Sequence, residues 1–265
     1  METKRNLKYF IAPPLSIPSL IGWAITVIGI ILIIAKLTLP GLLVTIVGIA
    51  VVAVTSGGKS TDTDIEFQIS ERIKDLQEQS EKHFEVYEKN FLKMLKPVNL
   101  RGYDFIEKET PFYFKKGSDG MNRTNYFTGM NLIFTNEKMF VYGRRFSLIN
   151  EEIDEKITSS FYFTELDKVV LDEKSYTTTI KKHEEQVPYY VFRVLKTDGE
   201  DAVALCVDYG ADIDKYVEQI SRAIVTRKKE LEKRAEETAQ RRAEFRARIE
   251  AEKEEIARGE RYEDE

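Results

Sequence analysis

Residues 17–58 read IPSLIGWAITVIGIILIIAKLTLPGLLVTIVGIAVVAVTSGG, and this stretch decides how the chain is organised. Lys36 is its only charged residue and divides it into two apolar runs. We expect helices at Ile17–Ala35 and Leu39–Val54, each near the length that crosses roughly 30 Å of hydrocarbon. The short link makes them antiparallel neighbours in a transmembrane hairpin. Because the second run is short, a thinned bilayer or a re-entrant loop is an alternative.

Glycines recur in both runs, and each pair is separated by two helical turns. Gly22 and Gly29 lie in the first run, and Gly41 and Gly48 lie in the second. Small residues on one face let membrane helices approach closely. The glycines therefore predict either that the hairpin packs against itself or that several chains form an oligomeric assembly or small pore. Neither run contains an ionisable residue, which argues against a transporter.

Basic residues flank the hairpin unequally. Lys4, Arg5 and Lys8 precede it and Lys59 follows it, whereas the connecting loop carries only Lys36. Positive residues are retained on the cytoplasmic side of membranes. We therefore expect an integral membrane protein with both termini in the cytoplasm.

Composition divides the chain into five segments. They are a cytoplasmic N-terminal segment (1–16), the hairpin (17–58), an amphipathic stalk helix (59–97), a β-rich domain (98–226) and a charged helical tail (227–265). In the stalk, apolar residues from Ile69 to Leu95 recur three or four apart, which predicts one helix that ends before Pro97. Its apolar face must pack on its own domain, on the C-terminal helix or on a second subunit.

Strand-like patterns fill the segment 98–226. The candidate strands are Phe112–Lys116, Asn131–Thr135, Lys138–Tyr142, Ile157–Phe163, Lys168–Asp172, Ser175–Lys181, Tyr189–Lys196 and Ala202–Val207. We expect hairpin turns at Asn136–Glu137 and Asp198–Gly199, and another at Asp172–Ser175. Antiparallel hairpins without helices between them indicate a barrel or sandwich. An amphipathic helix that begins near Asp212 can then cap one open end.

The tail from Arg227 onward is rich in Glu, Arg, Lys and Ala, with opposite charges three or four residues apart. This pattern is typical of a long, exposed helix, alone or loosely paired in a coiled coil. It serves either as a spacer or docking rod or simply as a solvated tail. Its basic and acidic residues nearly cancel, so we expect no nucleic-acid partner.

Two stretches resemble a known family. Residues 129–141, GMNLIFTNEKMFV, and residues 163–171, FTELDKVVL, are similar to successive strands of bacterial pleckstrin-homology-like (PH-like) and GRAM-like domains. The resemblance covers roughly 98–226. It implies an antiparallel β-barrel capped by a C-terminal helix, which binds lipid headgroups, peptides or proteins. Because lipid-binding members use basic residues around the first hairpin, it points to Lys115, Lys116 and Arg123 as headgroup contacts.

Catalytic chemistry is not expected from this sequence. The two histidines, His83 and His183, lie far apart, and Cys206 is the single cysteine. These residues predict no catalytic pair, metal site or bound cofactor, and no internal disulfide. Residues 53–60, AVTSGGKS, imitate a phosphate-binding loop, but they follow membrane-length sequence, so nucleotide hydrolysis is not expected.

Together these patterns predict an α+β membrane protein with a helical hairpin, a long helix, a PH-like barrel with its capping helix, and an extended charged helix. The expected function is that of a non-enzymatic adaptor or scaffold, which presents the PH-like domain to a protein partner at the cytoplasmic face. Two alternatives are recognition of anionic lipid headgroups and an oligomeric assembly or pore that self-associates through the glycine faces. Acidic residues outnumber basic ones between 98 and 226, which weakens attraction to an anionic leaflet.

Overall fold

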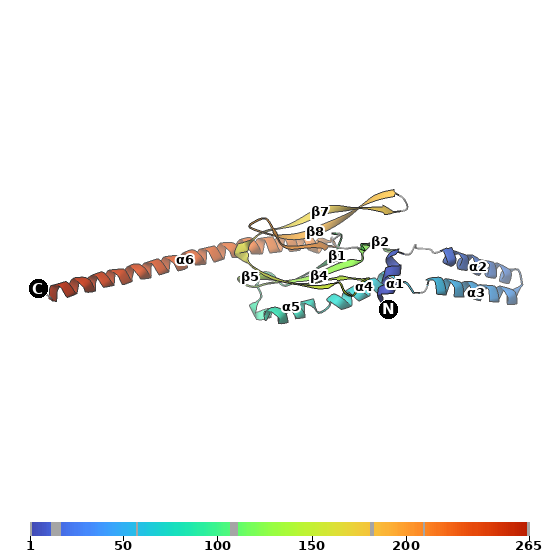
Figure 1. The fold of residues 1–265 in the computed structure, drawn as a ribbon, viewed down its shortest axis with the longest axis horizontal. Coiled ribbons are helices and arrows are strands. Elements are labelled where there is room, and N and C mark those ends of the chain that lie inside the picture. Colours follow the sequence, from blue (N-terminus) through green and yellow to red (C-terminus); the bar gives the residue numbers. More distant parts are fainter. Residues whose placement is uncertain are drawn as a thin grey trace.

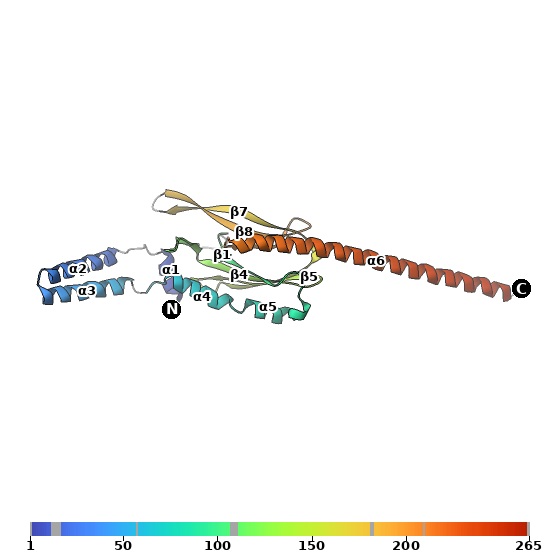
Figure 2. The same ribbon diagram turned by 180° about the vertical axis from the view of Figure 1, so that it is seen from behind.

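The computed structural model describes residues 2–11, 17–56, 58–106, 111–180, 183–208 and 210–263. The protein is a mixed α+β structure with antiparallel sheets. Figure 1 shows an elongated molecule with a helical hairpin at one end, β-sheets in the middle and a long helix at the other end. The view from behind in Figure 2 shows the same order along the long axis.

A short helix and the apolar hairpin form the N-terminal part. Helix α1 spans Glu2–Ile11, α2 spans Ile17–Ile34 and α3 spans Thr38–Ser56, so the two apolar helices match their predicted positions to within two residues. Lys36 adopts a left-handed conformation, with φ of 68°, in the turn between α2 and α3. Among the described residues, α2 alone is long and apolar enough to cross a membrane by length and composition, and Thr38–Val54 is a somewhat shorter apolar helix.

The four glycines lie where α2 and α3 touch. A Cβ atom on Gly22 would come within 2.8 Å of Val52, and one on Gly41 would come within 2.7 Å of Ile33. Added Cβ atoms on Gly29 and Gly48 would overlap Thr45 and Thr26. The glycines therefore face the partner helix of the same chain, and the outward surface of the hairpin consists of larger apolar side chains.

The predicted single stalk helix is wrong. The segment forms two helices, α4 (Asp62–Ile73) and α5 (Leu76–Phe84), and a 3-10 turn at Glu88–Asn90. Ile65 on α4 and Ser80 on α5 are buried on the inner sides of these helices. Leu92 and Leu95, beyond α5, lie in the core between the two sheets. One straight helix cannot pack on the sheet and also reach the core between the two sheets. The chain therefore turns at the end of α5, where Glu85 adopts a left-handed conformation.

Helices α4 and α5 lie against the outer face of the first sheet. Thr61 caps α4 in a capping box with Asp64, which satisfies backbone groups at both positions. Gly129 lies under the junction of the two helices, where a Cβ atom would come within 2.8 Å of Ile73 and 3.0 Å of Leu76. The missing side chain lets the helices approach the sheet, so this segment packs on its own domain.

Two antiparallel sheets and a short ribbon form the middle of the molecule. The first sheet has the order β1-β4-β5-β6, the second has the order β7-β8-β9, and the ribbon pairs β2 with β3. The strands are β1 (Val98–Tyr103), β2 (Phe114–Lys116), β3 (Asn122–Thr124), β4 (Tyr126–Phe134), β5 (Lys138–Ser147), β6 (Asp154–Tyr162), β7 (Leu166–Ile180), β8 (His183–Lys196) and β9 (Asp201–Val207). The sheets share one core, to which Leu132 contributes from the first and Phe192 from the second.

Several predicted strands are longer than expected, and β1 and β3 were not predicted. The hairpin turns at Asn136–Glu137 and Asp198–Gly199 are confirmed. The turn predicted at Asp172–Ser175 is wrong, because β7 continues through these residues. Their polar side chains lie on an edge strand where polar groups remain partly solvated, and Asp172 pairs with Arg193 on β8 at 2.9 Å.

Helix α6 (Ala211–Glu263) joins the predicted capping helix and the predicted tail without a break. Ile220 and Ile224 are fully buried in the core between the sheets. Arg227 is buried, whereas no residue from 228 to 253 is, and it donates hydrogen bonds to the carbonyl of Asn136. The change of composition at residue 227 therefore marks where α6 leaves the sheets.

Candidate functional site

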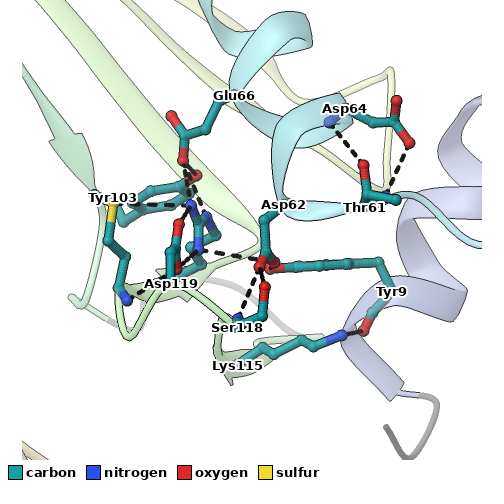
Figure 3. A network of polar contacts seen from close by, with 11 residues as sticks. Tyr9, Thr61, Asp62, Asp64, Glu66, Tyr103, Lys115, Ser118 and Asp119 are labelled. Atoms are coloured by element: carbon teal, nitrogen blue, oxygen red, sulfur yellow. Dashed lines mark hydrogen bonds and ion pairs between the residues drawn. The ribbon is translucent and has the colours of Figure 1, made fainter.

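A polar network joins α1 and α4, the helices on either side of the hairpin, to the β domain (Figure 3). Its centre is Arg123 on β3. The Arg123 side chain is 0% exposed, and its guanidinium donates to Asp119 at 2.8 and 2.6 Å. It also donates to Glu66 at 3.0 Å and lies 3.8 Å from Asp62. A buried guanidinium is tolerated because these carboxylates satisfy its charge and donors.

The carboxylates around Arg123 outnumber it, but they are not fully buried. The side chains of Asp119 and Glu66 are 41% and 42% exposed. Their outer oxygens remain hydrated, so the excess negative charge is screened by solvent. Hydrogen bonds from Arg123 lower the pKa of Asp119 to about 2, which keeps that carboxyl ionised near neutral pH.

Two tyrosines complete the network. The hydroxyl of Tyr9 on α1 donates to Asp62 at 2.5 Å, and the hydroxyl of Tyr103 on β1 donates to Glu66 at 2.8 Å. Burial raises the pKa of both phenols, and the neighbouring carboxylates raise it further. Burial opposes ionisation of Asp62, but hydrogen bonds from Ser118 and Tyr9 outweigh it and lower the pKa of this carboxyl. The tyrosines therefore stay protonated and act as donors.

Asn6 on α1 links both ends of the hairpin to the domain. Its amide donates to Gln68 on α4 and to the carbonyl of Leu148, each at 2.7 Å. Its side-chain oxygen accepts a hydrogen bond from Ser60 at 2.6 Å. Because α1 precedes the hairpin and Ser60 follows it, the two chain segments that flank the hairpin are held at one place on the domain.

A cleft of about 460 Å³ opens beside this network. Its lining residues are Tyr9, Lys59, Ser60, Thr61, Asp62, Lys115, Lys116, Gly117 and Ser118. Lys115 donates to the backbone carbonyl of Tyr9 at 2.6 Å, and its ammonium lies 3.7 Å from the centre of the Tyr9 ring. Burial lowers the pKa of Lys115, and the charge of Lys59 lowers it further.

The three predicted headgroup residues have different roles in the structure. Lys115 and Lys116 line the cleft, and Lys116 also lies 3.7 Å from Glu185. Arg123 is buried and bound to carboxylates, so it presents no surface to a headgroup. Lys59 takes its place in the cleft. From the sequence, Lys59 is expected at the headgroups where the chain leaves the hairpin, but nothing local shows that it meets the β2–β3 ribbon.

His83 and Cys206 lie outside this network, on α5 and β9. Within the described part of the chain, no three His, Cys, Asp or Glu side chains are placed to hold a metal ion. The His83 ring lies 4.7 Å from that of Phe84 and 5.6 Å from that of Tyr142, between centroids. Cys206 is buried, and burial raises the pKa of its thiol to about 11.

The chain was compared with models of protein families, with curated proteins and with solved structures. None of the three comparisons finds a match, so no family is assigned to this chain.

Proposed function

We propose that the protein is a membrane-anchored, non-enzymatic scaffold whose α2–α3 hairpin lies in the bilayer. The observation that carries this proposal is the surface of the hairpin. Large apolar side chains are exposed along both helices, including Ile17, Ile31, Ile34 and Leu39, and only 22% of α2 is buried. The core helix of a soluble protein hides such side chains, and exposed apolar surface of this extent marks contact with lipid or protein.

The polar groups of the hairpin also suit a hydrocarbon environment. The Thr26 hydroxyl donates to the carbonyl of Gly22 at 2.9 Å, and the Thr45 hydroxyl donates to the carbonyl of Gly41 at the same distance. In lipid no water can satisfy a hydroxyl, so each must find an internal partner. Both hydroxyls have one.

The contacts of α1 support a chain that enters the membrane and returns. Asn6 and Ser60 are bonded to each other across the base of the hairpin. A single crossing would leave these residues on opposite sides of the bilayer. Lys4, Arg5, Lys8 and Lys59 then lie on the retained side, which the basic bias assigns to the cytoplasm.

The β domain is the part that we propose to be PH-like. Its antiparallel strands are followed by a helix that packs into the core between the two sheets, and a C-terminal helix after antiparallel strands is what the resemblance implies. A hairpin that holds this domain at the membrane raises its effective concentration for partners at the same surface. Weak contacts with a partner protein then suffice.

The test is a topology measurement on the full-length chain. Cys206 is replaced by Ser, and single cysteines are placed by Lys36→Cys and Ala243→Cys. On intact bacterial cells, a membrane-impermeant maleimide should label the Lys36 position only, and both positions after permeabilisation. The chain should also stay with membranes in alkaline carbonate. Release into the soluble fraction, or labelling of position 243 from outside, would refute the proposal.

A second candidate function is recognition of an anionic lipid headgroup, which the position of the cleft favours. Lys59, Lys115 and Lys116 line it where the chain leaves the hairpin, at the level that headgroups would occupy. In nanodiscs, a change from phosphatidylcholine to phosphatidylglycerol should raise the melting temperature of the wild type. The gain should be lost in Lys59→Glu and Lys116→Glu and kept in the exposed control Lys93→Glu. An equal gain in all variants would exclude the cleft.

A further inference from the structure

Helix α6 continues far beyond its last contact with the sheets. Arg227 is buried and Leu231 is partly packed against the core, but every residue from 232 to 253 is exposed. This length corresponds to about 33 Å of helix at 1.5 Å per residue. Figures 1 and 2 show α6 directed away from the hairpin, at the opposite end of the molecule. The bilayer that we assign to the hairpin therefore does not cover this part of α6.

A narrow apolar stripe runs along the exposed part of α6. Phe245 is 64% exposed and Ile249 is 37% exposed, and they lie one turn apart. Leu231, Ala235 and Thr238 continue the same stripe at spacings of four and three residues, and Arg242 occupies the stripe position between Thr238 and Phe245. Such spacing places all of them on one face. Phe245 and Ile249 together give this face two apolar anchors one turn apart, the spacing by which one helix packs on another.

Charges are distributed unequally around this stripe. At 100° per residue, Arg234, Arg241, Arg242, Arg246, Arg248 and Lys253 lie on the stripe side of the helix. Glu236, Glu237 and Glu244 lie on the opposite side. Glu252 is the carboxylate on the stripe side between residues 234 and 253, and Glu250 lies at its border, as far from Ile249 as Arg248 on the other flank. We define the Arg–Phe face as the stripe from Ala235 to Ile249 together with these six basic residues.

Four arginines of this face have no ion pair within the described part of the chain: Arg241, Arg242, Arg246 and Arg248. On the opposite side of the helix the charges are paired, since the ammonium of Lys233 lies 3.9 Å from the carboxylate of Glu237. Positive charge is therefore available on the Arg–Phe face.

A second copy of this face is a poor partner. With Phe245 and Ile249 in the seam of a parallel coiled coil, Arg241 would face Arg246 of the other copy and Arg248 would face Lys253. Arg242 would also meet its own counterpart in the seam. An antiparallel pair brings basic flanks together as well, and like charges at these positions oppose pairing. Charge complementarity requires a partner of opposite sign.

We propose that the Arg–Phe face binds an acidic amphipathic helix of another protein, in a coiled coil whose partner carries Glu or Asp beside its apolar stripe. This inference rests on the proposed scaffold function and gives it a partner of defined chemistry. The hairpin fixes the chain at the membrane, and α6 holds the binding face away from it. The partner is therefore a soluble protein recruited to the membrane surface.

The experiment uses the full-length chain in detergent and two synthetic peptides of matching length. Both have Leu at the seam positions a and d. One has Glu at the flanking positions e and g, and the other has Lys. Fluorescence anisotropy should show binding of the Glu peptide and none of the Lys peptide. The double variant Phe245→Ala, Ile249→Ala should weaken binding about tenfold or more, because truncated anchor residues dominate interface energies.

Matched variants separate this face from net charge. Arg241→Glu and Arg248→Glu together should weaken binding of the Glu peptide about tenfold or more, because four basic residues of the face remain but two attractive contacts become repulsive. Lys233→Glu changes charge on the opposite side of the helix and should leave the Glu peptide bound. Equal binding of both peptides, binding of neither, preference for a DNA duplex, or dimers crosslinked through Thr238→Cys would each overturn the proposal. Maleimide labelling tests the hairpin separately, so a failure here with normal topology leaves the scaffold function standing.

Discussion

At the scale of single residues, Arg123 decides how the base of the hairpin is built. Its side chain is fully buried, and it contacts carboxylates from α4 and from the β2–β3 ribbon. Removing one partner of a buried ion pair costs more than the pair contributes, because the remaining charges lose their compensation. Asp62, the most buried of the three carboxylates, would suffer most from its loss.

We expect Arg123→Met to lower the free energy of unfolding by about 3 kcal/mol. This value is near the lower end for the loss of one partner of a buried ion pair, because Glu66 and Asp119 are partly exposed. Arg123→Lys should cost less, since it keeps the charge but loses the planar, forked geometry. Urea unfolding in detergent measures both. The exposed control Arg246→Met should change stability little. Equal stability of Arg123→Met and wild type would contradict the structural role.

The Asp119 carboxyl makes the network sensitive to acid. Its pKa is lowered to about 2 by Arg123, below the ordinary aspartate value of about 3.9. A lowered pKa in the folded state contributes stability above the unfolded pKa, and this contribution is lost as the pH falls through the folded value. Asp119→Asn should therefore be less stable than wild type at pH 7, and the difference should shrink below about pH 4. Urea midpoints across this range test it, and Glu152→Gln is the exposed control.

At the scale of elements, close packing of α2 and α3 depends on residues without side chains. Gly48 faces Thr26, and Gly29 faces Thr45. These contacts leave the glycine faces occupied within one chain, so an oligomer or pore would have to use the outer, larger apolar side chains. Self-association stays a prediction that rests on the sequence alone.

We expect Gly48→Leu to force the two helices apart and lower stability by about 1–3 kcal/mol, the usual cost of overpacking. Ala50→Leu is the matched control, because Ala50 is exposed on the outer surface of α3. Melting temperatures in the same detergent compare the two variants. If they melt together, the hairpin does not pack through its glycines.

At the scale of the whole molecule, hydrogen bonds from α1, as well as the covalent chain, connect the segments that flank the hairpin to the β domain. Asn6 bonds to Ser60, to Gln68 and to the carbonyl of Leu148. These contacts hold α1 against the domain although the hairpin separates them in sequence. With the hairpin in a bilayer, as we propose, the orientation of the β domain and the outward direction of α6 depend on these contacts.

Asn6→Ala should release α1 from the domain, because it leaves buried polar groups of Ser60 and Leu148 unpaired at a cost of about 1–3 kcal/mol. Hydrogen exchange should then accelerate in residues 2–11 and stay slow in β4 and β5. Lys4→Ala, on the exposed side of the same helix, should leave exchange unchanged. If hydrogen exchange accelerated equally throughout the domain, α1 would unfold together with the domain and would not be a separate element held by Asn6.

Local patterns in the sequence determined the two apolar helices, the turn that contains Lys36, most strands and the amphipathic start of α6, because each follows from hydrophobic period and turn residues over a short window. Only the tertiary structure decided that the predicted stalk helix is interrupted, since Ile65 on α4 and Leu92 beyond α5 pack in different clusters of the core. It also decided that Arg123 is internal and that Lys59 lies beside Lys115 and Lys116. Burial and charge pairing depend on residues distant in sequence, and no local pattern records which of them meet.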